Sequence, residues 1–441
     1  MPNARAAYAT MGLVCLLPPS GGSAQDADPK LLSYVESIRA IDDHAHVVAP
    51  APGRDEDYDQ LRCEELPPAV SLPPANFRFG PELQAAWKAL YAFSGSPGSD
   101  EDLKGLDARK NAERGQRGNQ YHDWVREQAG LDVVLANRVA MAPGLGSHFL
   151  WVPYVDALLV PLDNSAEKAR NPDRRALFGM AEQLLGRYLH EVGLAAPPPT
   201  LDGYLDQVVL PTLARLKQQG AVALKFEVAY LRALDFQAPD RKAASAVYAR
   251  GGVPGSADYK RLQDLLFHVI AAEAGRLGLA VHIHTGTGCG EYFDDAGADP
   301  LLLTPVLNDP ELRQTRFVLL HGGMPNERHV ASLILKPNVY ADTSVLEFFF
   351  SPAELARVLR PWLEMMPERV LFGTDAGPFG PGADWEETTW LGSRNARRAL
   401  ALALTGMVKD GVIGEARAKQ IADGVLRRNA AQLYHLEGKA E

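Results

Sequence analysis

The stretch AVHIHTGTG at residues 280–288 contains a short apolar run that ends in histidine and then in a glycine-rich turn. FVLLHGG at residues 317–323 repeats this transition, and in VLFGTDAG at residues 370–377 an aspartate stands where the other two runs have histidine. Short apolar runs bounded by turn residues are typical of buried strands. We therefore expect each run to be a strand that carries polar side chains at its carboxyl end.

Eight such strands are expected to alternate with helices along the chain. We predict them at residues 41–46, 132–140, 149–155, 221–228, 280–284, 316–321, 338–343 and 369–374. Helical patterns, for example at 201–219, 259–277 and 352–364, separate them. This alternation predicts an α/β fold with a parallel sheet, and eight units favour closure into a (β/α)8 TIM barrel. An open doubly wound sheet would normally carry a glycine-rich nucleotide loop after its first strand, where this chain has DDHAHVVAP.

The remaining sequence is expected to elaborate this barrel. Residues from about 47 to 130 are rich in proline, glycine and charge without a strand–helix alternation, which predicts a large insertion after strand 1. Ala-, Leu- and Arg-rich segments at 394–409 and 415–436 predict extra C-terminal helices outside the barrel. We expect residues 25–441 to form a single barrel domain.

The first 24 residues have the pattern of an export signal. Arg5 precedes the apolar run 11–17 (MGLVCLL), and small residues before Ala24 offer a cleavage point. This pattern predicts a secreted or periplasmic protein that has no membrane association after cleavage. An unstructured tail or a misplaced start remains the alternative.

The composition is that of an ordinary globular protein. Of 441 residues, 46% are hydrophobic and 23% are charged, and the formal net charge is −10. An acidic surface repels phosphate backbones, so nucleic acid is not expected as a partner. We expect a small-molecule substrate, and the composition is compatible with a homo-oligomer.

Histidines gather at the carboxyl ends of the predicted strands. Five of the 11 histidines lie at three such ends: His44, His46, His282, His284 and His321. Strand side chains alternate between faces, so residues two apart point the same way. TIM-barrel enzymes place their chemistry at this end of the barrel, and imidazoles there are suitable ligands for a metal such as zinc. A scatter of structural histidines would rarely give this pattern.

The ordered set of strand-end motifs resembles the amidohydrolase superfamily. The motifs are D-H-A-H at 43–46, H-T-G at 284–286, H-G-G at 321–323 and G-T-D-A at 373–376. The ending VLRRNAAQLYHL at 425–436 is also similar to the terminal helix of the amidohydrolase-related branch. The resemblance covers residues 38–436 and implies a metal-dependent hydrolase. A decarboxylase or isomerase on the same scaffold is the alternative, and a binding protein without turnover is a third.

The resemblance implies a role for each matching residue. His44, His46, His284 and Asp375 would bind Zn2+ or another divalent transition metal, one or two ions per chain. A metal-activated water would attack an amide, lactone or related carbonyl group, and Asp375 would accept its proton. His321 would polarise the substrate carbonyl or bind a second metal.

Several further residues are expected near the metal. In AVALKFEVAY at 221–230, Lys225 and Glu227 share one face of the fourth strand. The resemblance implies that a carboxylated Lys225 would bridge two metals, whereas an unmodified lysine would pair with Glu227 or bind an anionic substrate. We expect one metal. Glu227, His282 and Glu347 are candidate substrate-binding residues, although a second-layer or core position is the simpler expectation for His282.

Two cysteines lie outside the expected signal. Cys63 belongs to the insertion, and Cys289 follows the fifth strand. Both loops leave the same end of the predicted barrel, so a disulfide across its mouth is an expectation to test, with two free thiols as the alternative.

Overall fold

The computed structural model describes residues 26–49, 55–66 and 80–436. The expected signal at 1–24 and parts of the insertion lie outside these ranges. Regular strands occur at β1 (Ala40–Ala45), β2 (Leu131–Asn137), β3 (Phe149–Val152), β4 (Ala223–Phe226), β5 (Ala280–His284), β6 (Phe317–Leu320) and β7 (Val339–Ala341). Seven of the predicted strands are therefore confirmed, most of them shorter than expected.

All neighbouring strands are parallel. Regular hydrogen-bonded ladders join β1, β2 and β3 into one sheet and β4 to β7 into another. Further backbone hydrogen bonds, such as Val155 N to Lys225 O (3.0 Å), connect β3 with β4. The parallel arrangement gives one edge at which all the strands end, and this edge carries the predicted site.

The eighth predicted strand closes the barrel without forming a regular ladder. The backbone of Leu371 donates to Ala341 O after β7 (2.8 Å), and that of Asp375 donates to His44 O in β1 (2.7 Å). The segment makes only isolated bridges, at Val370 and at Ala376, and the predicted regular strand at 369–374 is corrected accordingly. One reason is that the side chain of Asp42 accepts hydrogen bonds from the amide and hydroxyl of Thr374 (2.9 and 2.6 Å).

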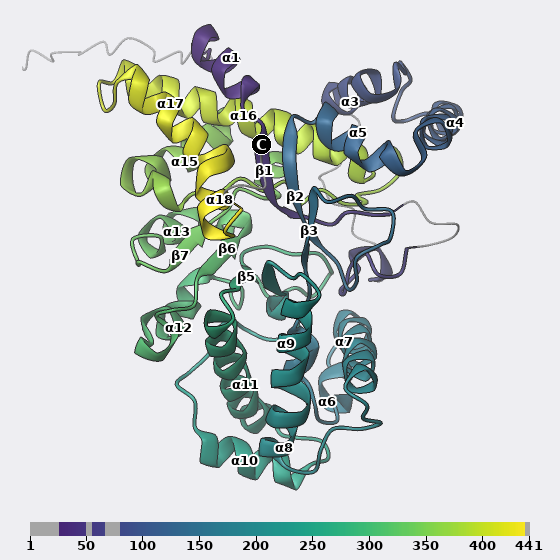
Figure 1. The fold of residues 1–441 in the computed structure, drawn as a ribbon, viewed down its shortest axis with the longest axis vertical. Coiled ribbons are helices and arrows are strands. Elements are labelled where there is room, and N and C mark those ends of the chain that lie inside the picture. The colour runs from purple at the N-terminus through teal and green to yellow at the C-terminus, as the bar shows by residue number, and fades with distance from the viewer. Residues whose placement is uncertain (1–25, 50–54, 67–79, 437–441) are drawn as a thin grey trace, which may run out of the picture.

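Helices surround the strands on the outside (Figure 1). The α-helices that follow β3 in the chain, up to the C-terminal helices, are α6 (Ser165–Lys168), α7 (Pro172–Glu191), α8 (Leu201–Tyr204), α9 (Leu210–Gln218), α10 (Arg241–Arg250), α11 (Ser256–Arg276), α12 (Thr304–Asn308), α13 (Glu327–Leu333), α14 (Leu346–Phe349) and α15 (Pro352–Met365). The C-terminal helices are α16 (Trp385–Lys409), α17 (Glu415–Asp423) and α18 (Asn429–Leu433). Helix α16 begins earlier than expected because Asp384 and Glu387 form a capping box at its start.

The described part of the insertion contains three α-helices, and it packs against the outer helix α16. It contains α3 (Pro81–Tyr91), α4 (Asp100–Arg117) and α5 (Tyr121–Gln128), while α1 (Pro29–Ser37) precedes β1. Buried Lys110 of α4 forms ion pairs with Asp384 (2.5 Å) and Glu387 (3.0 Å). Both carboxylates lie where α16 begins, and they neutralise the charge of the buried lysine. These ion pairs join the insertion to α16, and Figure 1 shows α3 and α5 next to that helix.

A second part of the insertion, residues 55–66, runs to the barrel mouth. Asp55 forms a bidentate ion pair with Arg138 (2.8 and 2.9 Å), and Cys63 forms a disulfide with Cys289 after β5. The disulfide proposed from the sequence is thus formed in the structure. Two fixed points therefore hold this segment over the carboxyl ends of the strands.

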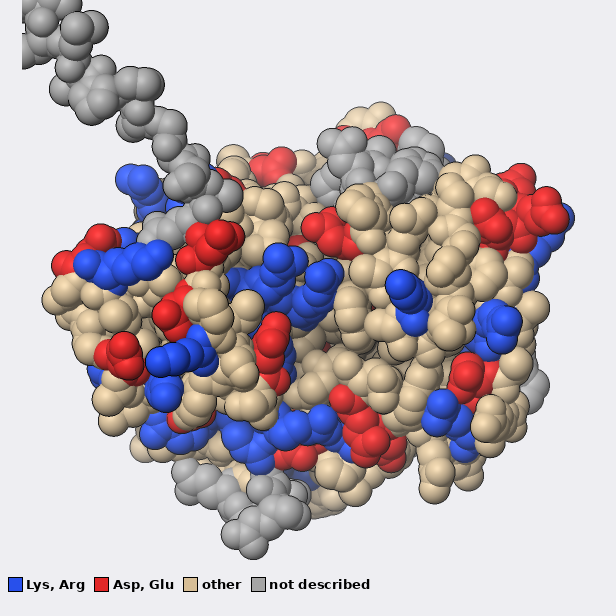
Figure 2. Space-filling model, turned by 90° about the horizontal axis from the view of Figure 1, so that it is seen from above, with Lys and Arg blue, Asp and Glu red and all other residues tan. Residues whose placement is uncertain are grey.

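Among the described residues, the exposed large hydrophobic side chains are Val253, Tyr292, Leu301, Leu335, Met365 and Val412. On the face seen in Figure 2, basic and acidic side chains are interspersed. Within the described ranges, the helices are all too short or too polar to cross a bilayer.

Candidate active site

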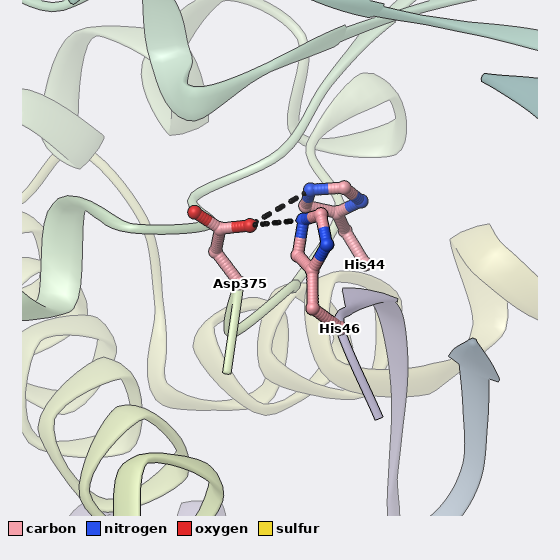
Figure 3. A group of neighbouring side chains, drawn as sticks. All are labelled: His44, His46 and Asp375. Carbon is pink, nitrogen blue, oxygen red and sulfur yellow. Dashed lines mark ion pairs between the residues drawn. The ribbon is translucent and has the colours of Figure 1, made fainter. Parts of the chain in front are cut away.

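The centre of the site is a carboxylate that faces two imidazoles (Figure 3). Oδ1 of Asp375 lies 2.9 Å from His44 Nε2 and 3.1 Å from His46 Nε2. The two histidines stand on one face at the end of β1, and Asp375 follows the eighth strand segment. Their ligand atoms all lie within 4.8 Å of one another. Three of the four predicted metal-binding side chains are therefore brought together.

Two residues of the site have a left-handed backbone. The φ angle is +65° at His321, which immediately follows β6, and +56° at Asp375, which lies in the irregular eighth segment. Non-glycine residues seldom adopt this conformation, and it is found most often where function requires a particular side-chain direction. The sharp turn lets each side chain face the barrel mouth.

The carboxylate of Asp375 and the imidazole of His46 each favour the charged form of the other. Burial alone would raise the pKa of Asp375, but the nearby His321, His44 and His46 hold it well below its usual range. Burial likewise opposes charge on His46, yet the carboxylates of Asp59 and Asp375 raise its pKa to about 10. The site thus keeps Asp375 ionised and favours positive charge next to it.

The outer ring nitrogens of both histidines are held by other side chains. Nδ1 of His46 lies 3.2 Å from Asp59 Oδ2 and 3.2 Å from the hydroxyl of Tyr154. Nδ1 of His44 lies 2.6 Å from the side-chain amide of Asn137 in β2. Such contacts fix the orientation of a ligand ring, and a carboxylate behind an imidazole also makes it more basic.

His284 and His321 occupy the same pocket. Their ring centroids are 4.5 Å apart, and Nδ1 of His321 lies 3.0 Å from Ser344 Oγ and 3.9 Å from Asp375 Oδ2. Burial is the main cause that lowers the pKa of His284 to about 3 and the pKa of His321 well below its usual value. Both rings are therefore neutral at neutral pH. Within the described ranges, Nε2 of His284 is buried and has no hydrogen-bond partner.

Lys225 lies next to His44, and Glu227 lies in the pocket wall. Nζ of fully buried Lys225 is 3.3 Å from His44 Nε2 and 4.0 Å from Glu227 Oε1. Glu227 follows β4 and lines the pocket, as the sequence predicted for a substrate-binding residue. Burial is the main cause that raises the pKa of Glu227 well above its usual value.

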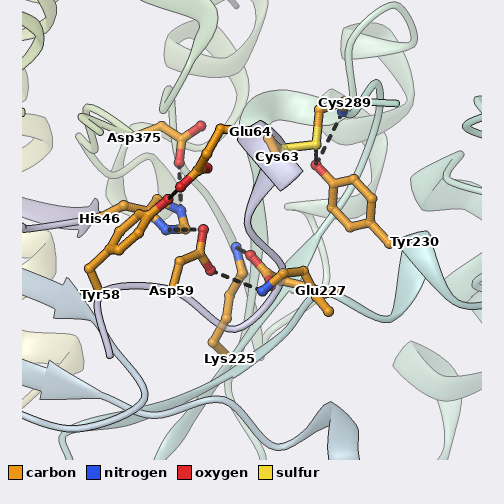
Figure 4. Close-up of a disulfide and its surroundings, with 11 residues drawn as sticks. His46, Tyr58, Asp59, Cys63, Glu64, Lys225, Glu227, Tyr230, Cys289 and Asp375 are labelled. Atoms are coloured by element: carbon orange, nitrogen blue, oxygen red, sulfur yellow. Dashed lines mark hydrogen bonds and ion pairs between the residues drawn. A yellow bond between two sulfur atoms is a disulfide. The ribbon is translucent and has the colours of Figure 1, made fainter. Parts of the chain in front are cut away.

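The pocket lies at the carboxyl ends of the strands. Among the described residues its wall contains His46, Tyr58, Asp59, Leu61, Cys63, Glu64, Glu227, Tyr230, His284, Thr287, Gly288, His321, Val345, Phe349, Asp375, Gly377, Pro378 and Phe379. Figure 4 shows how the segment with Tyr58, Asp59 and Glu64 meets the barrel residues next to the disulfide. The wall combines aromatic rings with four carboxylates.

Two predicted substrate-binding residues do not reach this wall. His282 lies one step deeper in β5, where its Nε2 contacts the hydroxyl of Tyr434 (2.8 Å). Glu347 is buried in α14, and its backbone oxygen accepts from Asn395 of α16. The inward direction of His282 was predicted, but a side chain two residues before the strand end lies in a lower layer of the barrel.

Among the wall residues that were not predicted as site residues from the sequence, Tyr58, Asp59 and Glu64 contribute polar groups to the pocket. They belong to the insertion, which has no periodic pattern that could place its side chains. The one available signal was Cys63, because its predicted disulfide would bring the preceding residues to the mouth.

The donor set fits a divalent transition metal. Two imidazole nitrogens and one carboxylate oxygen converge, and this is a common ligand combination for zinc. The raised pKa of His46 shows that the residues favour a cation at this place. Burial keeps His44 and His284 neutral, as metal ligation requires.

Fold and site together define a metal-dependent enzyme on a TIM barrel. This chain belongs to the amidohydrolase family, because the family model described as Amidohydrolase matches residues 197–436. Protein fluG of Emericella nidulans is 32% identical over 168 residues, which are 38% of this chain and 18% of fluG. The chain thus spans less than a fifth of the length of this relative.

Solved structures share the fold at low sequence identity. A protein from Lactobacillus casei assigned as a metal-dependent hydrolase superposes with a TM-score of 0.65 at 16% identity, covering 95% of this chain and 100% of that one. Glucuronate isomerase from Caulobacter crescentus gives 0.56 at 14% identity, with 94% and 96% covered. At these identities the likeness concerns the fold, which confirms the predicted TIM barrel.

The disulfide offers a direct test of how the insertion contributes to the pocket. Cys63 and Cys289 are 226 residues apart, so their bond restricts the unfolded chain strongly. Replacing both by serine should lower the free energy of unfolding by about 2–4 kcal/mol, measured by urea denaturation. The Michaelis constant should also rise, because Asp59 and Glu64 lose one of their two fixed points. Intact-mass analysis that finds two free thiols in the protein purified without reductant would contradict the bond itself.

Proposed function

We propose that this protein is a metal-dependent hydrolase that cleaves an amide, lactone or related carbonyl bond in a small molecule. The observation that carries the proposal is the convergence of His44 Nε2 and His46 Nε2 on Asp375 Oδ1 at the carboxyl ends of the strands. His44, His46 and Asp375 would hold the metal, with His284 as a further ligand. A bound zinc or similar ion would polarise the carbonyl group and activate water at neutral pH.

The protein residues would manage the proton and the substrate. Ionised Asp375 can accept a proton from the attacking water and later pass that proton on to the leaving group. Neutral His321, oriented by Ser344, can donate a hydrogen bond to the carbonyl oxygen as negative charge develops there. Asp59 and Asn137 keep the rings of His46 and His44 in place.

An isomerase is the second candidate, because glucuronate isomerase shares the fold. A sugar acid carries a carboxylate that an enzyme has to bind. Among the described residues, the pocket wall includes no lysine or arginine that could pair with such a carboxylate. This supports a hydrolase rather than an isomerase or decarboxylase of acids.

A substrate screen on the zinc-loaded protein tests the proposal. Panels of small amides and lactones, sugar acids and aromatic acids should be followed for acid release, for isomerisation and for CO2 release. We expect acid release alone. Turnover limited to isomerisation or decarboxylation would replace the proposal with the corresponding alternative.

We further propose that the site holds one metal and that Lys225 is unmodified. Nζ of Lys225 lies 4.0 Å from Glu227 Oε1, where it can pair with that side chain, and the compact donor group around Asp375 supports one ion. Metal analysis should give one equivalent in the parent and in Lys225→Met, a substitution that keeps most of the buried volume. Two equivalents in the parent that fall to one or none in the variant would show a bridging lysine instead.

The disulfide supports a location in an oxidising compartment, such as the periplasm or the extracellular space. We retain this location, and a small-molecule substrate as partner, as part of the proposal.

A further inference from the structure

One buried carboxylate of the pocket has an oxygen without a partner. Within residues 26–49, 55–66 and 80–436, Oε2 of Glu227 makes no hydrogen bond, although the residue is only 4% exposed. Its other oxygen is 4.0 Å from Lys225 Nζ, which is beyond hydrogen-bond distance. Burying a carboxylate without donors is costly, so such a group calls for a ligand that supplies one.

The surroundings of Glu227 indicate the charge of that ligand. Its carboxylate forms a group with His46 and Asp59 in which the polar atoms lie within 4.8 Å of one another. Tyr230, three residues later in the chain, and Tyr58 also line the pocket. Carboxylates beside aromatic rings favour an organic cation, which forms an ion pair with one and a cation–π contact with the other.

Lys225 does not remove this preference. It is fully buried and does not contribute to the pocket wall among the described residues, whereas Glu227 does. Its charge partly balances Glu227, while Asp59 and Glu64 keep the wall acidic. Figure 4 shows Lys225 below Asp59 and Glu227, with the disulfide above these two carboxylates.

We propose that Glu227 is the residue that selects the substrate, by binding a protonated amine next to the bond that is cleaved. Glu227 and the reaction centre at Asp375 both adjoin His46, so the amine and the carbonyl belong to one small acyl group. The substrate class is therefore an aminoacyl amide or ester. This inference rests on the proposed hydrolase function.

The kinetic test compares Glu227→Gln with the parent on two probes. Alanine p-nitroanilide carries a free amine, and N-acetylalanine p-nitroanilide is its neutral counterpart. The parent should prefer the first, and Glu227→Gln should lose about 10- to 100-fold in kcat/KM on it with little change on the second. Glu182→Gln in α7, which contacts Lys168 away from the pocket, is the matched control and should behave as the parent. A parent that prefers the acetylated probe would overturn the inference and leave the hydrolase proposal intact.

A binding test separates the inference from the hydrolase function. Calorimetry on the zinc-loaded protein should show that n-butylammonium binds more tightly than n-butanol or butyrate and that Glu227→Gln removes this preference. If that holds while neither anilide is hydrolysed, the amine site stands and the function fails. Metal content should be equal in the parent and in Glu227→Gln. A loss of metal in the variant would make Glu227 a metal ligand and overturn the amine site.

Discussion

Exhaustive chelation should abolish turnover, and stoichiometric zinc should restore it. His44, His46 and Asp375 are preorganised around one point, so the protein without metal keeps its donors but lacks the group that activates water. A catalytic metal contributes several kcal/mol to transition-state stabilisation, and the loss should therefore exceed about 10³-fold in kcat/KM. The measurement is the rate on an active probe before chelation, after it, and after metal return.

The control for chelation is the fold itself. The barrel core and the disulfide do not depend on a metal, so circular dichroism should change little when the ion is removed. Restoration by zinc with an unchanged spectrum would assign the loss to chemistry. Full turnover in protein shown by metal analysis to be free of metal would reject metal dependence.

Much of the barrel could be predicted because strand ends carry a strong signal. The apolar runs before His284 and His321 are short, and a glycine-containing turn follows each of them. Alternation then places His44 and His46 on one face without further information. The eighth strand was harder, because hydrogen bonds from Thr374 to the side chain of Asp42 replace part of a regular ladder.

The remaining site features depend on how deep a side chain lies in the barrel and on contacts between residues far apart in the sequence. His282 and His284 share a face of β5, but only the second reaches the pocket, and alternation cannot distinguish layers. Asp59 reaches His46 because an ion pair at Asp55 and the disulfide at Cys63 hold its segment. Such tertiary contacts leave no periodic trace in a sequence rich in proline and charge.

Asp375→Asn should lower turnover by about 10²–10⁴-fold, the usual contribution of a positioned proton acceptor. The amide keeps the shape of the side chain but has no ionised oxygen to take a proton or to face His44 and His46. Metal affinity should also fall, because one charged ligand is lost. Rates are therefore measured at increasing zinc until they no longer change, which separates weak metal binding from lost proton transfer.

Asp202→Asn is the control. Asp202 lies exposed on α8 and pairs with Arg241, so this substitution should leave kcat unchanged. Recovery of the parent rate at saturating zinc would limit Asp375 to metal binding, and a rate within a few-fold of the parent at every zinc concentration would remove it from the mechanism.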